Sequence, residues 1–177
     1  TLQDLANTQV DAEVKGKILL DEVSSYYPLE DLTLKGLLAI DAKMKGVINP
    51  DLQKIPQTDV KLNITNGYVK SGDYPAIEKL TFISTAFAKG DMNSLKANIQ
   101  ELDIVLDGQH FVASGDFSNL EDLNYNVKAN GLMNLEKLMH VFPIEGTKLK
   151  GIVDVDHFYT QGKMSDVLEE NYLALKT

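Results

Sequence analysis

The chain has no cysteine, no arginine and no tryptophan. The lack of cysteine excludes disulfides, thiolate nucleophiles, cysteine-based zinc sites and iron–sulfur clusters. All 17 basic residues are lysines, and 26 acidic residues bring the net charge to −9. Without the planar fork of arginine, an acidic protein binds phosphate backbones and guanine edges poorly. We therefore expect no nucleic-acid partner.

Long hydrophobic runs and a signal-peptide pattern are also absent. No stretch of eighteen apolar residues occurs, so the sequence predicts no membrane-spanning helix. The chain begins at Thr1 without the basic, apolar and small-residue regions of a signal peptide. We therefore expect residues 1–177 to be one fragment of a longer protein.

Motifs that carry chemistry are missing as well. The sequence contains neither the GxSxG nucleophile elbow nor the GxxxxGK[ST] phosphate loop. The histidines His110, His140 and His157 lack the spacing of a metal-ligand set. Hydrolase, nucleotide-binding and zinc-binding functions thus lose their usual support.

Acidic residues cluster in two places. Alternation puts Asp154 and Asp156 on one face of a strand, where they could serve as an acid/base pair. The second cluster, a possible calcium site, lies near a turn and contains Asp116, Ser118, Glu121 and Asp122. Because 26 acids in 177 residues form clusters by chance, we predict no enzyme, no catalytic residue, no cofactor and no metal.

Most of the chain alternates between apolar and polar residues, which is typical of strands that bury one face. Strands are expected from Leu34 onward and over 58–69, 80–87, 111–115 and 123–129. Asn66-Gly67 and Asp107-Gly108 are expected to be turns. The alternation slips near Gln100 and Glu101, which predicts a β-bulge. Antiparallel hairpins are the natural connections.

Three segments have helical spacing instead. Two apolar stripes end at prolines, which cannot continue a helix, and the third has Ser165 as its expected N-cap and Asp166 in its first turn. The stripes are Leu20, Val23 and Tyr27 before Pro28; Leu135, Leu138, Met139 and Phe142 before Pro143; and Met164, Val167, Leu168 and Tyr172.

A repeat with a period of 115 residues links the two ends of the chain without any gap. It predicts a repeat unit over 10–124 and the start of a second unit over 125–177, both belonging to a longer array. Two similar β-α-β pieces inside one closed domain are the alternative. The identical pairs are Gly16/Gly131, Leu20/Leu135, Pro28/Pro143, Glu30/Glu145, Leu34/Leu149, Lys35/Lys150, Gly36/Gly151 and Asp41/Asp156.

These glycine, proline and apolar spacings resemble the AsmA family of Gram-negative envelope proteins. The resemblance covers most of the chain and lies in three stretches. They are VKGKILLDEVSSYYPLEDLTLKGLLAIDAKMKG (14–46), VKLNITNGYVKSGDYPAIEKLTF (60–82) and LNYNVKANGLMNLEKLMHVFPIEGTKLKGIVDVDHFYTQGKMSD (123–166).

The resemblance implies a periplasmic, β-rich segment of a protein that is held in the inner membrane by an N-terminal helix outside this sequence. It also implies a role in outer-membrane biogenesis, with phospholipid acyl chains and envelope proteins as partners. Together with the alternation, it predicts a mainly β fold with short α-helices, whose long twisted antiparallel sheet curls into an open groove. The groove candidates are Leu38, Ile40, Val60, Leu62, Ile64, Val153 and Val155.

One rival fold and function stays open from the sequence. The same apolar strand faces would also suit a closed β-sandwich, in which a second sheet buries them. Such a domain would be a scaffold that binds envelope proteins and no lipid. The two hypotheses differ in whether the faces of Leu38, Ile40 and Leu62 enclose open space or are fully packed.

Overall fold

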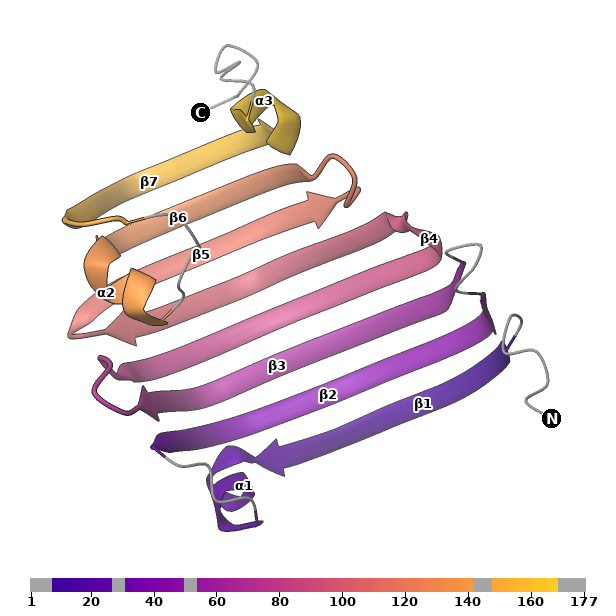
Figure 1. Ribbon diagram of the computed structural model, residues 1–177, viewed down its shortest axis with the longest axis horizontal. Coiled ribbons are helices and arrows are strands. Elements are labelled where there is room, and N and C mark those ends of the chain that lie inside the picture. The colour runs from indigo at the N-terminus through magenta and orange to yellow at the C-terminus, as the bar shows by residue number, and fades with distance from the viewer. Residues whose placement is uncertain (1–7, 27–30, 50–53, 142–147, 169–177) are drawn as a thin grey trace.

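The computed structural model describes residues 8–26, 31–49, 54–141 and 148–168 (Figure 1). It is mainly β with three short helices, as the sequence predicts. The elements in chain order are β1 (Thr8–Leu19), α1 (Leu20–Tyr26), β2 (Leu32–Ile48), β3 (Ile55–Ser71), β4 (Ile77–Leu106), β5 (Gln109–Ser118), β6 (Asn124–Asn134), α2 (Leu135–Val141), β7 (Ile152–Lys163) and α3 (Met164–Leu168).

All the strands belong to one antiparallel sheet, in which each strand pairs with its neighbours in the sequence, in the order β1-β2-β3-β4-β5-β6-β7. Within the described residues no second sheet covers either face. The chain exposes 12205 Å² of accessible surface. A compact protein of 19.6 kDa exposes roughly 8,600 Å² by the usual scaling with mass. The fold is therefore an open layer, and it does not form the closed sandwich of the rival hypothesis.

Strand β4 folds back on itself, so that the sheet has eight strand segments. Lys79 Nζ lies 2.7 Å from Asp103 Oδ2. A straight strand would separate residues 24 positions apart by roughly 80 Å. The chain reverses at Gly90 (φ +91°) and Ser94, whose N–H donates to Asp91 Oδ1 over 3.1 Å.

The strand predictions are confirmed, and so are the Asp107-Gly108 turn and the bulge at Gln100-Glu101. The predicted turn at Asn66-Gly67 is wrong, because both residues lie inside β3. Asn66 adopts a φ of +52° at a β-bulge, where the register shifts between Ile64 and Gly67. The Asn-Gly pair favours the left-handed region in bulges as well as in turns.

Two β-α-β units, β1-α1-β2 and β6-α2-β7, lie where the sequence places the two repeated segments. Their helices begin at the equivalent residues Leu20 and Leu135. The equivalent glycines Gly36 and Gly151 also share a left-handed backbone, with φ of +114° and +108°. The expected helix residues Tyr27, Pro28, Phe142, Pro143 and Tyr172 lie outside the described residues.

Helix α3 exists, but its N-terminal cap differs from the prediction. Ser165 lies within the helix, and its backbone N–H donates to Asp122 Oδ1 over 3.0 Å. The cap therefore comes from a residue 43 positions earlier, before β6. Asp166 lies in the first turn, as predicted.

Few apolar side chains are buried deeply, which follows from the single-layer architecture. The buried hydrophobic residues are Ile77, Ala88, Ile104 and Leu106, and no described side chain is less than 2% exposed. Most strand residues are half-buried, each covered by its neighbours along and across the sheet. Among the described helices, none has the length and apolar character needed to cross a membrane.

Candidate functional site

Five of the predicted groove residues lie together on one face of β2 and β3. The strand register pairs Leu38 with Ile64 and Ile40 with Leu62, while Val60 pairs with Ala42. Directly opposed residues of antiparallel strands project from the same side of the sheet. The sequence prediction therefore identified a real cluster of apolar neighbours.

The other two predicted residues, Val153 and Val155, lie on β7 at the far edge of the same sheet. They pair with Met133 and Gly131 of β6, and Gly131 pairs in turn with Phe111 of β5. Both valines project from the same face as the first five residues. They are nevertheless separated from that cluster by β4, β5 and β6, so the seven residues do not form one compact site.

We call the face that carries these residues the apolar face. None of the residues paired on this face in the described strands is charged, from β1 to β7. Its other large members are Val10, Val14, Ile18, Leu34, Met44, Ile48, Val69, Leu80, Phe82, Ile99, Leu102, Ile104, Leu106, Phe111, Phe117, Tyr125, Val127, Met133 and Phe158.

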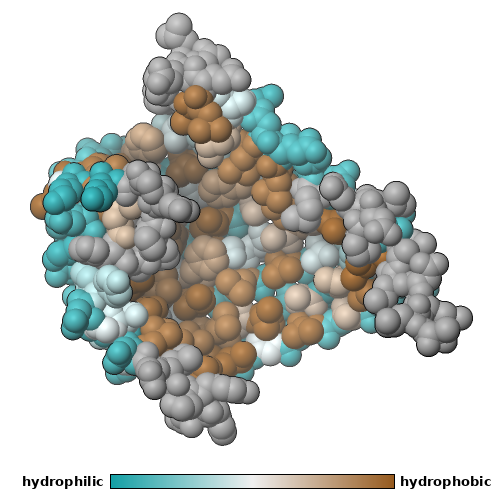
Figure 2. Space-filling model, viewed as in Figure 1, coloured by the Kyte–Doolittle hydropathy of each residue, from teal (hydrophilic) through white to brown (hydrophobic). Residues whose placement is uncertain are grey.

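The apolar face is open rather than packed. Val14, Ile18, Val153 and Phe158 are 56%, 45%, 38% and 46% exposed, and the five clustered residues are half-buried. Figure 2 shows hydrophobic side chains gathered across the middle of this face, with hydrophilic ones at its margins. Soluble monomers rarely expose a continuous apolar patch of more than a few hundred Å², so the apolar face is a candidate binding surface.

The opposite face, which we call the polar face, carries a lattice of charges. Across β1 and β2, Lys15 Nζ lies 3.1 Å from Asp41 Oδ2, and Glu13 Oε1 lies 3.3 Å from Lys43 Nζ. On β3, Lys61 pairs with Asp41 and Asp59 pairs with Lys43. Charges of opposite sign therefore face each other across these strands.

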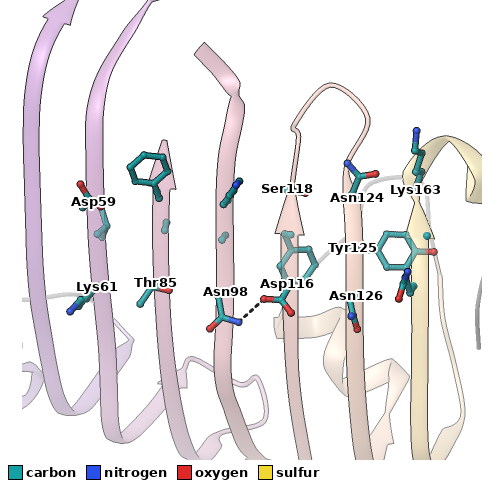
Figure 3. A pocket seen from close by; sticks show the side chains of 18 of the residues that line it. Asp59, Lys61, Thr85, Asn98, Asp116, Ser118, Asn124, Tyr125, Asn126 and Lys163 are labelled. Carbon is teal, nitrogen blue, oxygen red and sulfur yellow. Dashed lines mark hydrogen bonds between the residues drawn. The ribbon is translucent and has the colours of Figure 1, made fainter. Parts of the chain in front are cut away.

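The polar face also contains a hollow of about 1130 Å³, which the sequence analysis missed. Figure 3 shows Asp59, Lys61, Thr85, Asn98 and Asp116 around it, contributed by neighbouring strands. Asn98 Nδ2 donates to Asp116 Oδ1 over 2.7 Å. The alternation placed these residues on the polar side, but only the lateral order of the strands brings them together. Their hydrogen-bonding groups can bind water and polar molecules, and Phe87 adds an apolar side chain to the same lining.

The structure places the residues of the two acidic clusters in different surroundings. Asp154 and Asp156 are exposed, and Asp156 lies in a β-bulge where its carboxylate contacts the His157 ring. Asp122 caps α3 and lies 3.8 Å from Lys163. No group of three or more His, Asp or Glu side chains with metal-binding geometry occurs among the described residues.

One carboxylate is held in a tight polar cluster. A hydrogen bond from Lys79 keeps the pKa of Asp103 below its usual range. Burial of the carboxylate opposes this effect, and His110 Nε2, 2.9 Å from Asp103 Oδ1, adds to it. The Asp103 side chain is only 14% exposed. This cluster ties the two arms of β4 to β5, so its role is structural.

Comparisons with known proteins identify no relative. No protein-family model, no curated protein and no solved structure matches this chain.

Proposed function

We propose that this chain is a non-enzymatic, periplasmic segment of an AsmA-like envelope protein, and that it holds or conducts lipid acyl chains along its apolar face in outer-membrane biogenesis. The observation that carries the proposal is the continuous, uncharged and open surface running from β1 to β7. The glycine and proline spacings that resemble the AsmA family support it independently.

The energetics favour a hydrocarbon occupant. An acyl chain that buries roughly 400 Å² of apolar surface gains about 10 kcal/mol before the costs of association, at ~25 cal/mol per Å². No charge on the paired strands of the apolar face has to be desolvated in this process. Such a face recognises chains without selecting a headgroup, which suits a conduit for several phospholipids.

The test is native mass spectrometry, with lipid extraction, of the 177-residue protein purified gently from a Gram-negative host. We expect phospholipid to co-purify with the wild type and to be lost in Ile40→Asp and Leu62→Asp, because each substitution puts a charge in the middle of the apolar face. Asn63→Asp is the matched control, since Asn63 is adjacent to Leu62 and projects from the polar face. Circular dichroism checks that all three variants keep the sheet.

Two outcomes would contradict the proposal. A wild-type protein without lipid would favour the rival function, a scaffold that binds envelope proteins and no lipid. Lipid retained equally in Ile40→Asp and Asn63→Asp would place the lipid elsewhere on the molecule.

A further inference from the structure

Strand β1 is an edge strand whose outer side pairs with no other described strand. All of its residues except Val10 are exposed, and it pairs with β2 without a register shift from Thr8 to Leu19. A long, regular edge of this kind is a template for the addition of another strand.

The order of charges along β1 is self-complementary. On the polar face the strand presents Asp11, Glu13, Lys15 and Lys17 in succession. Antiparallel pairing with a second β1, centred on Val14, would place Asp11 opposite Lys17 and Glu13 opposite Lys15 of the other copy. All four cross-strand contacts would then join opposite charges, each of which stabilises a sheet.

We propose that β1 pairs with β1 of a second copy of this chain, about a twofold axis at Val14, to form one continuous sheet. The twofold axis would be perpendicular to the sheet, so the two apolar faces would lie on the same side. Val10 would oppose Ile18, and Ala12 would oppose Gly16. A symmetric dimer of this type has the same surface patch on both copies.

The charge lattice of the polar face extends across this interface without a mismatch. Within one copy, a single row reads Lys61, Asp41 and Lys15 from β3 to β1. In the pairing, the row continues into Glu13, Lys43 and Asp59 of the second copy. Six consecutive strands would thus carry alternating signs, so the ion pairs already present in each copy favour the contact.

Other registers are less favourable. A shift by two residues in either direction puts Glu13 opposite Glu13 or Lys15 opposite Lys15 on the axis. A shift by one residue puts apolar side chains opposite charged ones on both faces. The centring on Val14 is therefore specific.

The other edge strand, β7, is unsuited to such pairing. It is interrupted by the bulge at Asp156 and His157, where His157 has a φ of +53°. A bulge in an edge strand opposes the addition of another strand. The contrast with the regular β1 edge predicts a closed dimer rather than an open filament.

Cysteine cross-linking tests the register directly, because the chain has no native cysteine. We expect Val14→Cys to form a disulfide-linked dimer under mild oxidation, since opposed residues of antiparallel strands lie about 5 Å apart. Ala12→Cys is the matched control, because it shares the face and strand of Val14. The two copies of residue 12 would lie about 14 Å apart, which is beyond the reach of a disulfide.

Charge reversal tests the complementarity. Lys17 lies opposite the neutral Ala39 of β2, so Lys17→Glu disturbs the interface without placing like charges within one copy. By sedimentation equilibrium we expect the dimer dissociation constant to rise about tenfold in Lys17→Glu and in Asp11→Lys. A mixture of the two variants should recover the wild-type constant as a heterodimer, because residues 11 and 17 would again carry opposite signs.

Three results would overturn the proposal. They are a wild-type protein that stays monomeric across the concentration range, equal cross-linking of Val14→Cys and Ala12→Cys, and a mixture no more dimeric than either charge variant alone. A dimer that stacks through its apolar faces would give equal cross-linking of the two cysteine variants, or a mixture no more dimeric than either charge variant alone. The outcome does not depend on whether the apolar face binds lipid.

Discussion

Lys79 and Asp103 are 24 residues apart in the sequence, yet their side chains form a 2.7 Å ion pair on the polar face. The contact joins the two arms of β4, and His110 brings β5 into the same cluster. Because both side chains project from the polar face, the apolar residues of the two arms also lie on one side of the sheet.

Asp103→Asn is expected to destabilise the protein by about 1–2 kcal/mol at neutral pH, because the Lys79 ammonium loses its charged partner at a largely buried contact. The pKa of Asp103 is lowered in the folded state, so its contribution is present above the unfolded pKa, near 4, and is lost as the pH falls through the folded pKa. Urea unfolding at several pH values measures this.

The control for Asp103 is Asp154→Asn, which removes an exposed carboxylate. It should change the free energy of unfolding by less than about 0.5 kcal/mol. A stability difference between wild type and Asp103→Asn that persists unchanged at acidic pH would contradict the assigned role of the carboxylate.

Gly131→Ala should be severely destabilising, whereas Gly16→Ala should be tolerated. A Cβ at residue 131 would lie 2.2 Å from the carbonyl oxygen of His110, and the φ of +122° adds strain. We expect a loss of about 3 kcal/mol or more. At Gly16 a Cβ meets nothing within 4 Å, so alanine should be neutral within about 1 kcal/mol. Thermal unfolding of both variants would contradict the predicted close approach if their melting temperatures were equal.

Alanine substitutions at the equivalent glycines Gly36 and Gly151 distinguish the cost of backbone strain from the cost of a steric clash. Gly36 and Gly151 share a left-handed φ, but only at Gly36 would a Cβ approach backbone oxygens, those of Thr65 and Asn66, to 2.8 Å. Gly151→Ala should cost about 1–2 kcal/mol from strain alone. Gly36→Ala should cost clearly more, and chemical denaturation compares the two. Equal costs would mean that the bulge opposite Gly36 can relax.

The sequence predicted the strands and the helices because these depend on local periodicity. Alternation alone put Leu38, Ile40 and Leu62 on one face, and the register confirmed it. It could not show that Val153 lies at the far edge of that face, since lateral order depends on which strands pair. The hollow of the polar face was missed for the same reason.

Local sequence signals gave wrong predictions where the same residue type is common in two kinds of local structure. Asn66 adopts the left-handed backbone that a turn needs, but uses it for a bulge. Ser165 has the chemistry of an N-cap and stands at the right place in the sequence, yet it lies inside α3. The actual cap, Asp122, is brought there by the pairing of β6 with β7, which no local pattern encodes.

Asp122→Ala and Ser165→Ala distinguish these two assignments. The Ser165 N–H donates to the Asp122 carboxylate, and this hydrogen bond is the main reason why the pKa of Asp122 lies below its usual range. Asp122→Ala should therefore speed hydrogen exchange at the amide of Ser165, because the amide loses its acceptor. Ser165→Ala removes only the hydroxyl and keeps the backbone donor, so exchange at residue 165 should change much less.

Acidification gives a second test of the same cap. A lowered pKa means that the cap stabilises α3 above the unfolded pKa and is lost as the pH falls through the folded value. Protection of the residue 165 amide, corrected for the intrinsic pH dependence of exchange, should fall with pH in the wild type and stay low throughout in Asp122→Ala. If Ser165→Ala lost protection as fully as Asp122→Ala, the serine hydroxyl would be the cap and the sequence prediction would have been right.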